Sequence, residues 1–451
     1  MPSDSSATLK IFMSSLGCDK NLVDAERMLG VLSDDGFVIT DDESEADAAI
    51  VNTCCFIDSA KKESIGEILR LASFKEEGKL RALVVSGCLA ERYRGEILKE
   101  LPEVDAIIGA KNLADAARAV RGVIEGKELK EYLEGALVEN RKLKRLVSTG
   151  GHYAYLKIAE GCDKFCSYCI LPHIRGRYTS FPMEELLAEA EKLAAGGVRE
   201  LIVIAQETTL YGTDIYGEKR LHVLLKELAK IEGIHWIRVL YCYPEEIYPE
   251  LIETMASEPK ICRYLDLPIQ SGSDAVLKAM GRRTDTEYIR GLVGRLREAM
   301  PDMTLRTSLI AGFPGETEKE HEETLDFVRE LRFDRLGVFE YSREEGTRAA
   351  SFKNQVHYRT KARRRRELME AQQEISLEKN RRLIGMAVEA VVVGYLPEEE
   401  VYEGRTRSDV PGVDGLIFFK SDRAHDSGDF VELVVTGAME YDLIGEEREM
   451  Q

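Results

Sequence analysis

Short apolar runs alternate with longer amphipathic stretches over the first third of the chain. Each of three apolar runs is followed by a stretch in which apolar residues recur at helical spacing, and these pairs occupy residues 10–32, 48–71 and 82–98. Strands that alternate with helices in this way predict a parallel sheet whose faces are covered by helices. We therefore expect a parallel α/β domain over residues 8–125.

The same alternation resumes near residue 153. Six further apolar runs precede amphipathic stretches, and they cover residues 154–159, 200–205, 236–240, 264–267, 303–310 and 336–341. A closed TIM barrel has eight βα units, so six units predict a partial, open (β/α)6 barrel of the TIM type over residues 148–380. Between the two regions, residues 126–147 are rich in Lys and Glu and lack a sustained apolar stripe, so we expect a linker there.

A basic segment lies near the end of the second region. Six of the eight residues in 359–366 are Lys or Arg, which favours either an RNA-binding patch or a charged helix. Apolar residues continue at helical spacing to residue 377. We therefore expect a helix that packs one face against the barrel and exposes the other.

The last region has a different pattern. From residue 383 the apolar runs are short and alternate with turns, at residues 387–393, 415–419 and 429–435, which predicts a small all-β barrel over residues 383–451. This region holds five Lys and Arg against sixteen Asp and Glu, a formal charge of −11 within a chain of −19. Such a surface repels a phosphate backbone and favours a basic partner.

The bulk composition excludes several classes of protein. A chain of 451 residues with 44% hydrophobic and 32% charged residues is expected to form about two to four globular domains. It has no apolar run long enough to span a membrane and no signal-peptide pattern at its start, so we expect a cytoplasmic protein without membrane contact. In that reducing compartment its nine cysteines suit metal ligands or buried thiols better than disulfides.

Three of the cysteines lie on one short loop with the spacing Cys162-x3-Cys166-x2-Cys169. A structural zinc site normally has four protein ligands, whereas three thiolates suit a 4Fe–4S cluster with one iron atom left for a non-protein ligand. A zinc knuckle and chance loop cysteines are the alternatives, and Tyr168 and the long α/β region that follows count against both. The motif resembles that of the radical S-adenosylmethionine enzymes, whose open iron chelates the amine and carboxylate of S-adenosylmethionine.

Three other cysteines follow successive apolar runs of the first region. Cys18, Cys54 and Cys88 each lie just beyond such a run. Neighbouring strands of an open parallel sheet deliver their loops to one edge, where ligands bind, so we expect these thiols to converge. The alternative is that each is a small buried core residue. Cys55 points to the opposite side from Cys54, and we expect it to be a bystander.

The motifs around these cysteines resemble the amino-terminal domain of the methylthiotransferases, a branch of the radical S-adenosylmethionine enzymes. The resemblance rests on Leu-Gly-Cys-Asp-Lys-Asn at residues 16–21, Asn-Thr-Cys at 52–54 and Gly-Cys at 87–88, and it covers nearly the whole chain. It implies that Cys18, Cys54 and Cys88 hold a second 4Fe–4S cluster with one open iron. It also implies that the last region is a TRAM-like domain, a type of barrel that often binds RNA.

Polar residues after the barrel strands are candidates for binding S-adenosylmethionine, because barrel chemistry takes place at the carboxyl ends of the strands. The resemblance implies that Tyr168 lies beside the adenine. It also implies that Glu207, Ser271 and Arg306 contact the amine, ribose or adenine of this cofactor. Each of these residues is equally consistent with an ordinary loop position, and no catalytic residue beyond the cluster ligands is predicted.

The segment that follows the cysteine loop matches a further motif of the family. Residues 172–176 fit its Pro-x-x-Arg-Gly pattern. Where the family often continues to a Ser-Arg pair, this chain has Ser180 and Phe181, which leaves the role of a second basic residue unassigned. We interpret His173 as a polar loop residue rather than a ligand.

The two main branches of this family differ in substrate. One methylthiolates an adenosine in transfer RNA, and the other methylthiolates the β-carbon of an aspartate in the basic ribosomal protein S-twelve. The acidic last region favours the second branch, and residues 17–24, 404–415 and 441–445 resemble it as well. We therefore expect S-twelve as the partner, met free or on the small ribosomal subunit, together with an electron donor, and no nucleic acid as primary substrate.

The resemblance also implies a reaction. Reductive cleavage of S-adenosylmethionine at the loop cluster gives a radical that removes hydrogen from the aspartate, and the second cluster presents a methylated sulfur. Methylthiolation of transfer RNA is the main alternative. A radical enzyme with another product and a non-catalytic electron carrier with two clusters are weaker alternatives.

Overall fold

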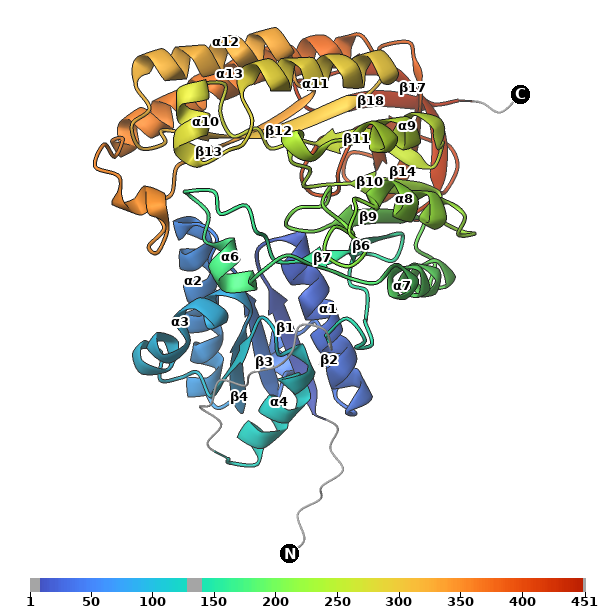
Figure 1. Cartoon of the computed structure of the whole chain (residues 1–451). Coiled ribbons are helices and arrows are strands. Elements are labelled where there is room, and N and C mark those ends of the chain that lie inside the picture. Colours follow the sequence, from blue (N-terminus) through green and yellow to red (C-terminus); the bar gives the residue numbers. More distant parts are fainter. Residues whose placement is uncertain (1–8, 128–139, 449–451) are drawn as a thin grey trace, which may run out of the picture.

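A computed structural model describes residues 9–127 and 140–448. The chain forms three parts, which Figure 1 colours along the sequence. The amino-terminal sheet with its helices is blue, the larger central sheet runs from green to orange, and the carboxyl-terminal barrel is red.

The amino-terminal part is a parallel sheet, as the apolar pattern predicted, but it has five strands where three apolar runs were identified. Its strand order is β2-β1-β3-β4-β5. Every residue of β3 and β4 is buried, because helices cover both faces of the sheet. The strands are β1 (Lys10–Ser15), β2 (Val38–Thr40), β3 (Ala48–Thr53), β4 (Ala82–Ser86) and β5 (Ala106–Gly109), and the helices are α1 (Asp19–Asp34), α2 (Asp58–Glu76), α3 (Gly87–Glu100) and α4 (Ala116–Ile124).

The central part is a six-stranded parallel sheet that does not close on itself. Its order is β13-β12-β11-β10-β9-β6, with β6 and β13 at the two edges, so the prediction of a partial (β/α)6 barrel is confirmed. The strands are β6 (Tyr153–Lys157), β9 (Glu200–Ile204), β10 (Trp236–Val239), β11 (Ile261–Asp266), β12 (Thr304–Ala311) and β13 (Arg335–Glu340). The helices are α6 (Leu171–Arg175), α7 (Met183–Ala195), α8 (Leu221–Ala229), α9 (Pro249–Ser257), α10 (Asp274–Met280), α11 (Thr286–Ala299), α12 (Glu318–Leu331) and α13 (Tyr358–Arg381).

The basic segment forms the start of α13 and packs as a charged helix with one buried face, as expected. Arg364 is buried and donates to Glu316 Oε1 at 2.9 Å, and Arg363 donates to Glu318 Oε2 at 2.7 Å. Further along the helix, Leu368 and Ile375 are buried in the core of the central part. These contacts use basic side chains that a nucleic-acid surface would keep free.

The carboxyl-terminal part is a closed five-stranded barrel, which confirms the predicted all-β barrel. Its order is β14-β15-β16-β18-β17, closed by the pairing of β17 with β14. The apolar runs predicted β14, β16 and β17 but not β15 and β18. The strands are β14 (Ala387–Leu396), β15 (Val401–Thr406), β16 (Ile417–Lys420), β17 (Phe430–Ala438) and β18 (Leu443–Glu447).

This barrel covers the face of the central sheet that the helices leave free. Val391 and Val410 pack against Trp236 and Tyr264 of that face. The buried carboxylate of Glu200 accepts hydrogen bonds from Arg238 Nε at 2.9 Å and from Arg405 Nη2 at 2.6 Å. Residues 404–415, which the sequence analysis singled out, thus form much of the contact between the two parts.

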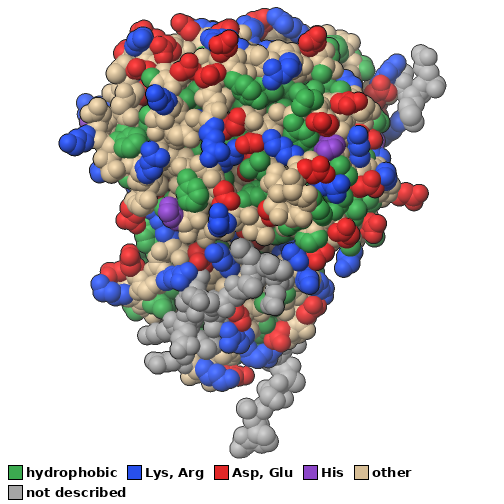
Figure 2. Space-filling view, viewed as in Figure 1, with side chains coloured by type: hydrophobic (Ala, Val, Ile, Leu, Met, Phe, Trp, Pro, Cys, Tyr) green, Lys and Arg blue, Asp and Glu red, His purple; other side chains and the backbone are tan. Residues whose placement is uncertain are grey.

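The surface of the barrel keeps its acidic character. Of its described residues, eight acidic side chains are exposed against three basic ones. The exposed acids include Glu398, Glu399 and Glu400 in the turn between β14 and β15, whereas Arg405 is buried and Asp409 is paired with Arg335. Over the face of the whole molecule seen in Figure 2, acidic and basic side chains are intermingled. No helix among the described residues is long and apolar enough to cross a membrane.

Candidate cofactor site

The loop with three cysteines is held in place by its own backbone and by α10. A short antiparallel pair, β7 (Ala159–Glu160) with β8 (Thr179–Ser180), closes the base of the loop. Inside it, the backbone N–H of Cys162 donates to the carbonyl of Gly176 at 3.2 Å, and that of Cys169 donates to the carbonyl of Cys166 at 3.0 Å. Ser167 N donates to the Met280 carbonyl at 2.8 Å. The loop is therefore built to hold its three thiols in a fixed arrangement.

We call Cys162, Cys166 and Cys169 the loop set. Their thiols lie close enough to affect one another's pKa. Cys162 and Cys166 are buried, and Cys169 is half-buried. Burial raises the pKa of Cys162 to about 11, and it raises the pKa of Cys169 still further, with a contribution from the neighbouring Cys166. Metal ligation by these thiols therefore requires the release of protons.

The other three cysteines come together at the carboxyl edge of the amino-terminal sheet. Cys18, Cys54 and Cys88 follow β1, β3 and β4, which are direct neighbours in the sheet. A Cβ atom placed on Gly17 would lie 2.8 Å from Cys54 Sγ, so the backbone before Cys18 touches the second cysteine. Burial raises the pKa of Cys54, and it raises the pKa of Cys88 to about 12. The structure therefore brings the three βα loops to one place. We call Cys18, Cys54 and Cys88 the sheet set.

Cys55 follows Cys54 in the chain and lies in the same buried core cluster as Cys88. It is fully buried in the apolar core beneath α2 and α3, beside Leu71 and Leu89. Its carbonyl accepts a hydrogen bond from Arg92 at 3.3 Å. That Cys55 is a bystander stays a prediction.

The donor chemistry of both sets fits iron–sulfur clusters. Among the described residues, no three His, Cys, Asp or Glu side chains are close enough to bind one metal ion together. In a cubic cluster each thiolate binds a different iron atom, so its ligands need a wider spacing than the ligands of a single ion. Two separate sets of three soft thiolates are the donor type that such clusters select.

Arg175 links the two cysteine sets, and the sequence analysis assigned it no role. It ends α6, directly after the loop set, and its side chain is 2% exposed. Its Nη2 donates to Cys88 Sγ at 3.2 Å and to Asn21 Oδ1 at 3.1 Å, while Nη1 donates to Asp24 Oδ2 at 2.6 Å. The match to the Pro-x-x-Arg-Gly pattern was the signal that could have identified it.

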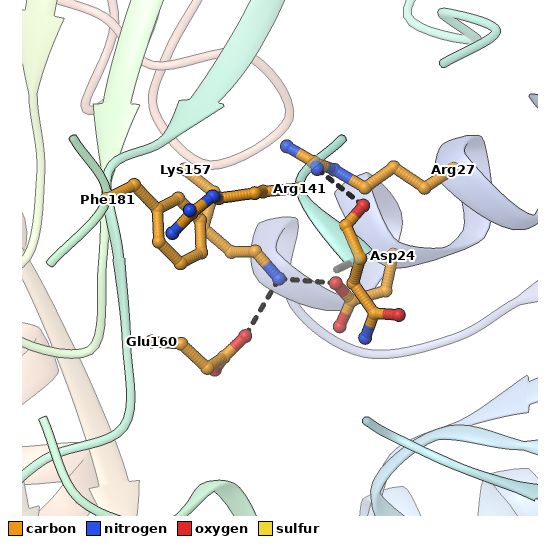
Figure 3. Close-up of a pocket in the computed structure, with 7 residues that line it drawn as sticks. Asp24, Arg27, Arg141, Lys157, Glu160 and Phe181 are labelled. Carbon is orange, nitrogen blue, oxygen red and sulfur yellow. Dashed lines mark hydrogen bonds and ion pairs between the residues drawn. The ribbon is translucent and has the colours of Figure 1, made fainter. Parts of the chain in front are cut away.

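A buried charge network joins α1 to the central sheet, and Figure 3 shows part of it. Arg175 contacts two of its carboxylates, those of Asp24 and Glu160. The ammonium group of Lys157 lies between the carboxylates of Asp24 and Glu160 and donates to Glu160 Oε2 at 2.8 Å. Arg27, from the same helix as Asp24, donates to the Asn140 carbonyl at 2.8 Å. The cavity between these groups is only about 10 Å³, room for about one water molecule. The network fixes the two parts relative to each other.

Glu207 has the features of a ligand-binding carboxylate. It lies just after β9 and is fully buried, and its Oε1 accepts from Thr209 N at 3.0 Å and from the Thr209 hydroxyl. Its Oε2 has no hydrogen-bond partner among the described residues. Burial raises its pKa to about 7, and its charge is felt by Cys162 of the loop set. An unpartnered buried carboxylate oxygen near this loop suits a cationic group of a ligand.

Comparisons with known proteins agree along the whole chain. The sequence matches the uncharacterized protein family UPF0004 over residues 10–109, the radical SAM superfamily over 156–328 and the TRAM domain over 384–447. The ribosomal protein uS12 methylthiotransferase RimO of Lachnoclostridium phytofermentans is 53% identical over 437 residues, which cover 97% of this chain and 99% of that protein. The protein of the same name from Geobacter sulfurreducens is 50% identical, over 98% of this chain and 99% of its own length.

The chain belongs to the uS12 methylthiotransferase family. Among solved structures, the radical S-adenosylmethionine methyltransferase TsrM from Kitasatospora setae, with cobalamin and a [4Fe-4S] cluster bound, has a TM-score of 0.55. The similarity covers 94% of this chain and 80% of that one at 15% identity, so it supports the fold alone.

Tyr168, the aromatic residue of the loop set, lies among both apolar and polar side chains, and its contact with adenine stays a prediction. Tyr168 packs against the apolar cluster of Met280, Phe313 and Tyr341. Two of its neighbours were missed by the sequence analysis, because nothing in the local sequence indicates them. They are Tyr243, whose hydroxyl lies 3.7 Å from Cys166 Sγ, and Arg282, whose guanidinium lies 4.1 Å from the Tyr243 ring centroid.

Two other residues assigned to the cofactor have partners inside the protein. The Ser271 hydroxyl lies 3.3 Å from the Thr324 hydroxyl and accepts from Ser273 N at 3.2 Å. Arg306 Nη1 donates to Asp266 Oδ1 at 2.8 Å, and its Nε lies 3.6 Å from Asp414 of the carboxyl-terminal barrel. Their contact with S-adenosylmethionine stays a prediction.

His173 lies in α6, and its ring contacts Phe165 edge-on at 6.2 Å between centroids. No ion pair or hydrogen bond to its ring appears among the described residues. The predicted loop position is therefore wrong, because α6 extends over His173, and the prediction that His173 is not a ligand stays untested.

Proposed function

We propose that this chain methylthiolates the β-carbon of an aspartate in ribosomal protein uS12, in a radical reaction that uses S-adenosylmethionine and two 4Fe–4S clusters. The observation that carries this proposal is the identity of about 50% over nearly the full length with proteins named for that activity. The two sets of three thiols support it, because the family's reaction needs two clusters in one protein.

Cys162, Cys166 and Cys169 would hold the cluster at which S-adenosylmethionine binds, and Cys18, Cys54 and Cys88 would hold the second cluster. When bound, these groups supply the radical and the sulfur chemistry that acid–base side chains cannot supply at an unactivated C–H bond. Each set leaves one iron without a protein thiolate, which is where a ligand can bind.

The side chains of the protein bind S-adenosylmethionine, orient the reacting groups and exclude water from them. The free Oε2 of Glu207 suits the ammonium group of S-adenosylmethionine, and Tyr168 suits the face of its adenine. We keep Ser271 and Arg306 as further contacts. Arg175 and Lys157 position the two sets relative to each other, since both bind Asp24 of α1.

The acidic carboxyl-terminal barrel would attract the basic uS12. Its eight exposed acids act chiefly on the association rate, because exposed charges steer an encounter more than they strengthen a complex. We further propose that the reaction takes place in the cytoplasm with an electron donor, on uS12 that is free or within the small ribosomal subunit. Our proposed domain limits are 8–125, 148–380 and 383–451, with a linker at 126–147, of which 128–139 lies outside the described residues.

A matched assay of both family substrates tests this proposal. The reconstituted protein is incubated without oxygen with reductant, sulfide and S-adenosylmethionine, and with either uS12 or unmodified transfer RNA. We expect a methylthio group on uS12 and none on the nucleoside. A methylthioadenosine in the transfer RNA digest, with unmodified uS12, would favour the alternative substrate.

A further inference from the structure

One buried lysine near the cysteine sets has no anionic partner. Lys20 lies in the first turn of α1, two residues after Cys18, and is 6% exposed. No hydrogen bond or ion pair joins its ammonium group to another residue in the described ranges. The ammonium group instead makes a cation–π contact with Tyr241, whose ring centroid lies 3.0 Å from Nζ. Lysines this buried are almost always paired, so an uncompensated one indicates a missing anion.

The partner of Lys20 is itself held in an unusual conformation. Tyr241 follows β10 and has a φ of +62°, a left-handed conformation that is costly for a residue with a bulky side chain. Its N–H donates to Asp266 Oδ2 at 3.1 Å and its hydroxyl donates to Asp19 Oδ2 at 2.8 Å. Such strain clusters at ligand-binding sites, and here two hydrogen bonds fix the ring on which the ammonium group rests.

Lys20 lies beside the sheet set, and its ring partner Tyr241 is close in the chain to a neighbour of the loop set. The sheet set contributes Cys18, whose charge is felt by Tyr241. Tyr241 leads within two residues to Tyr243, whose hydroxyl lies 3.7 Å from Cys166 of the loop set. A substrate that reacts with groups held by both sets has to come close to these residues.

We propose that Lys20 binds the side-chain carboxylate of the target aspartate and selects aspartate over asparagine. This inference rests on the proposed function, in which the reacting β-carbon is bonded directly to that carboxylate. Arg175, Lys157 and Arg306 are nearby cations, but each already binds carboxylates of the protein. Lys20 is left to pair with an incoming anion, and the same charge would disfavour a neutral nucleobase.

A carboxylate at Lys20 has two possible sources, the aspartate of uS12 and the methionyl group of S-adenosylmethionine. The test therefore compares wild type, Lys20→Met and Lys20→Arg, each reconstituted, with Lys144→Met as matched control. Lys144 lies on the surface, paired with Asp34 at 2.6 Å, so its loss removes one positive charge away from the site. Each protein is titrated with labelled uS12 and with uS12 whose target aspartate is replaced by asparagine, and S-adenosylmethionine binding is measured separately.

We expect wild type and Lys144→Met to bind aspartate uS12 more tightly than asparagine uS12 by about tenfold to a hundredfold, the usual size for a hydrogen bond between charged groups. Lys20→Met should lose this preference while keeping its iron content and its S-adenosylmethionine binding, and Lys20→Arg should recover part of the preference. An unchanged preference in Lys20→Met would overturn the proposal, and so would a loss of S-adenosylmethionine binding in that variant. Wild type that neither binds nor modifies uS12 would instead overturn the proposed function itself.

Discussion

The two cysteine sets each supply three thiols, but one set lies on a single loop and the other is assembled from three loops. The loop set lies within residues 162–169 and is held by backbone hydrogen bonds inside one loop and by the β7–β8 pair at its base. The sheet set draws one cysteine from each of three βα loops between residues 18 and 88, and only the order of β1, β3 and β4 brings them together. A local spacing can specify the first kind of site, whereas the second exists only after the sheet has formed.

The largest expected effect comes from removing each set in turn. Wild type should bind about eight iron atoms per chain, and either triple variant should bind about four, because each set holds one cluster. Changing Cys162, Cys166 and Cys169 to Ala should abolish 5′-deoxyadenosine formation. Changing Cys18, Cys54 and Cys88 to Ala should retain some of it, since the loop set does not depend on the sheet.

Iron analysis and product chromatography on the same samples measure these outcomes, with Cys55→Ala as the control that keeps both clusters. A sheet-set variant that still held about eight iron atoms would contradict the assignment of these three cysteines.

The dependence of the sheet set on strand packing can be tested without touching a cysteine. Gly87 has a φ of +89°, and a Cβ atom there would lie 2.5 Å from the Thr53 carbonyl oxygen. Gly87→Ala should therefore force β3 and β4 apart and lose about four iron atoms per chain, with the loop cluster intact. Gly36→Ala is the control, because Gly36 has a similar φ of +88° and open space around it. Full iron content in Gly87→Ala would show that the sheet set tolerates movement of its strands.

Arg175 tests whether the two sets are fixed to each other. Arg175→Met removes one of the two cations that face Asp24 and Glu160 in a buried site, and Lys157 alone remains between the two carboxylates. This change should lower the free energy of unfolding of the cluster-free protein by about 3–5 kcal/mol. Denaturant unfolding measures this change. Arg177→Met is the control, since the Arg177 side chain is 89% exposed. Equal stability of the two variants would mean that Arg175 does not join the two parts.

Glu207 should make stability depend on pH. Burial raises its folded pKa to about 7, so its contribution to stability is complete below its unfolded pKa and is lost as the pH rises through about 7. Relative to Glu207→Gln, the cluster-free wild type should lose roughly 2 kcal/mol between about pH 5.5 and about pH 8. Thermal or denaturant unfolding at these two pH values measures the difference. Parallel pH profiles of the two proteins would place the pKa of Glu207 near its ordinary value.

The smallest effect is expected on the acidic barrel. Changing Glu398, Glu399 and Glu400 to Lys should slow association with uS12 and leave S-adenosylmethionine cleavage unchanged, because exposed pairs contribute only about 0–1 kcal/mol each. The effect should fade with salt, as the Debye length falls from about 10 Å at 0.1 M to about 3 Å at 1 M. Stopped-flow binding at two salt concentrations measures it. Faster binding by the triple variant would argue against the barrel as the docking surface.

Much of the architecture could be predicted because it follows from periodicity. The alternation of apolar runs gave both parallel sheets, and the short runs after residue 383 indicated a barrel. Six strands were missed. Strands β2, β5, β7 and β8 have only two to four residues each, and β15 and β18 mix polar with apolar side chains. The convergence of Cys18, Cys54 and Cys88 could be predicted for the same reason, since each of them follows the end of a strand.

The contacts between the parts could not be predicted from the sequence. The pairs of Arg175 with Asp24 and of Glu200 with Arg405 join residues that are distant in sequence, and no local pattern signals them. Arg306 shows that a position in a predicted strand does not reveal the partners of its side chain. Its place on a barrel strand suggested a cofactor contact, yet the carboxylates of Asp266 and Asp414 lie beside its guanidinium group.

The most direct test of the account is the intact mass of uS12 after anaerobic reaction with reductant, sulfide and S-adenosylmethionine. Wild type should add one methylthio group in place of one hydrogen, and neither triple cysteine variant should change the mass, because both sets are required for the product. Unchanged uS12 after reaction with fully loaded wild type, or a methylthio group added by the Cys18, Cys54 and Cys88 variant, would contradict the claim that the two sets act together.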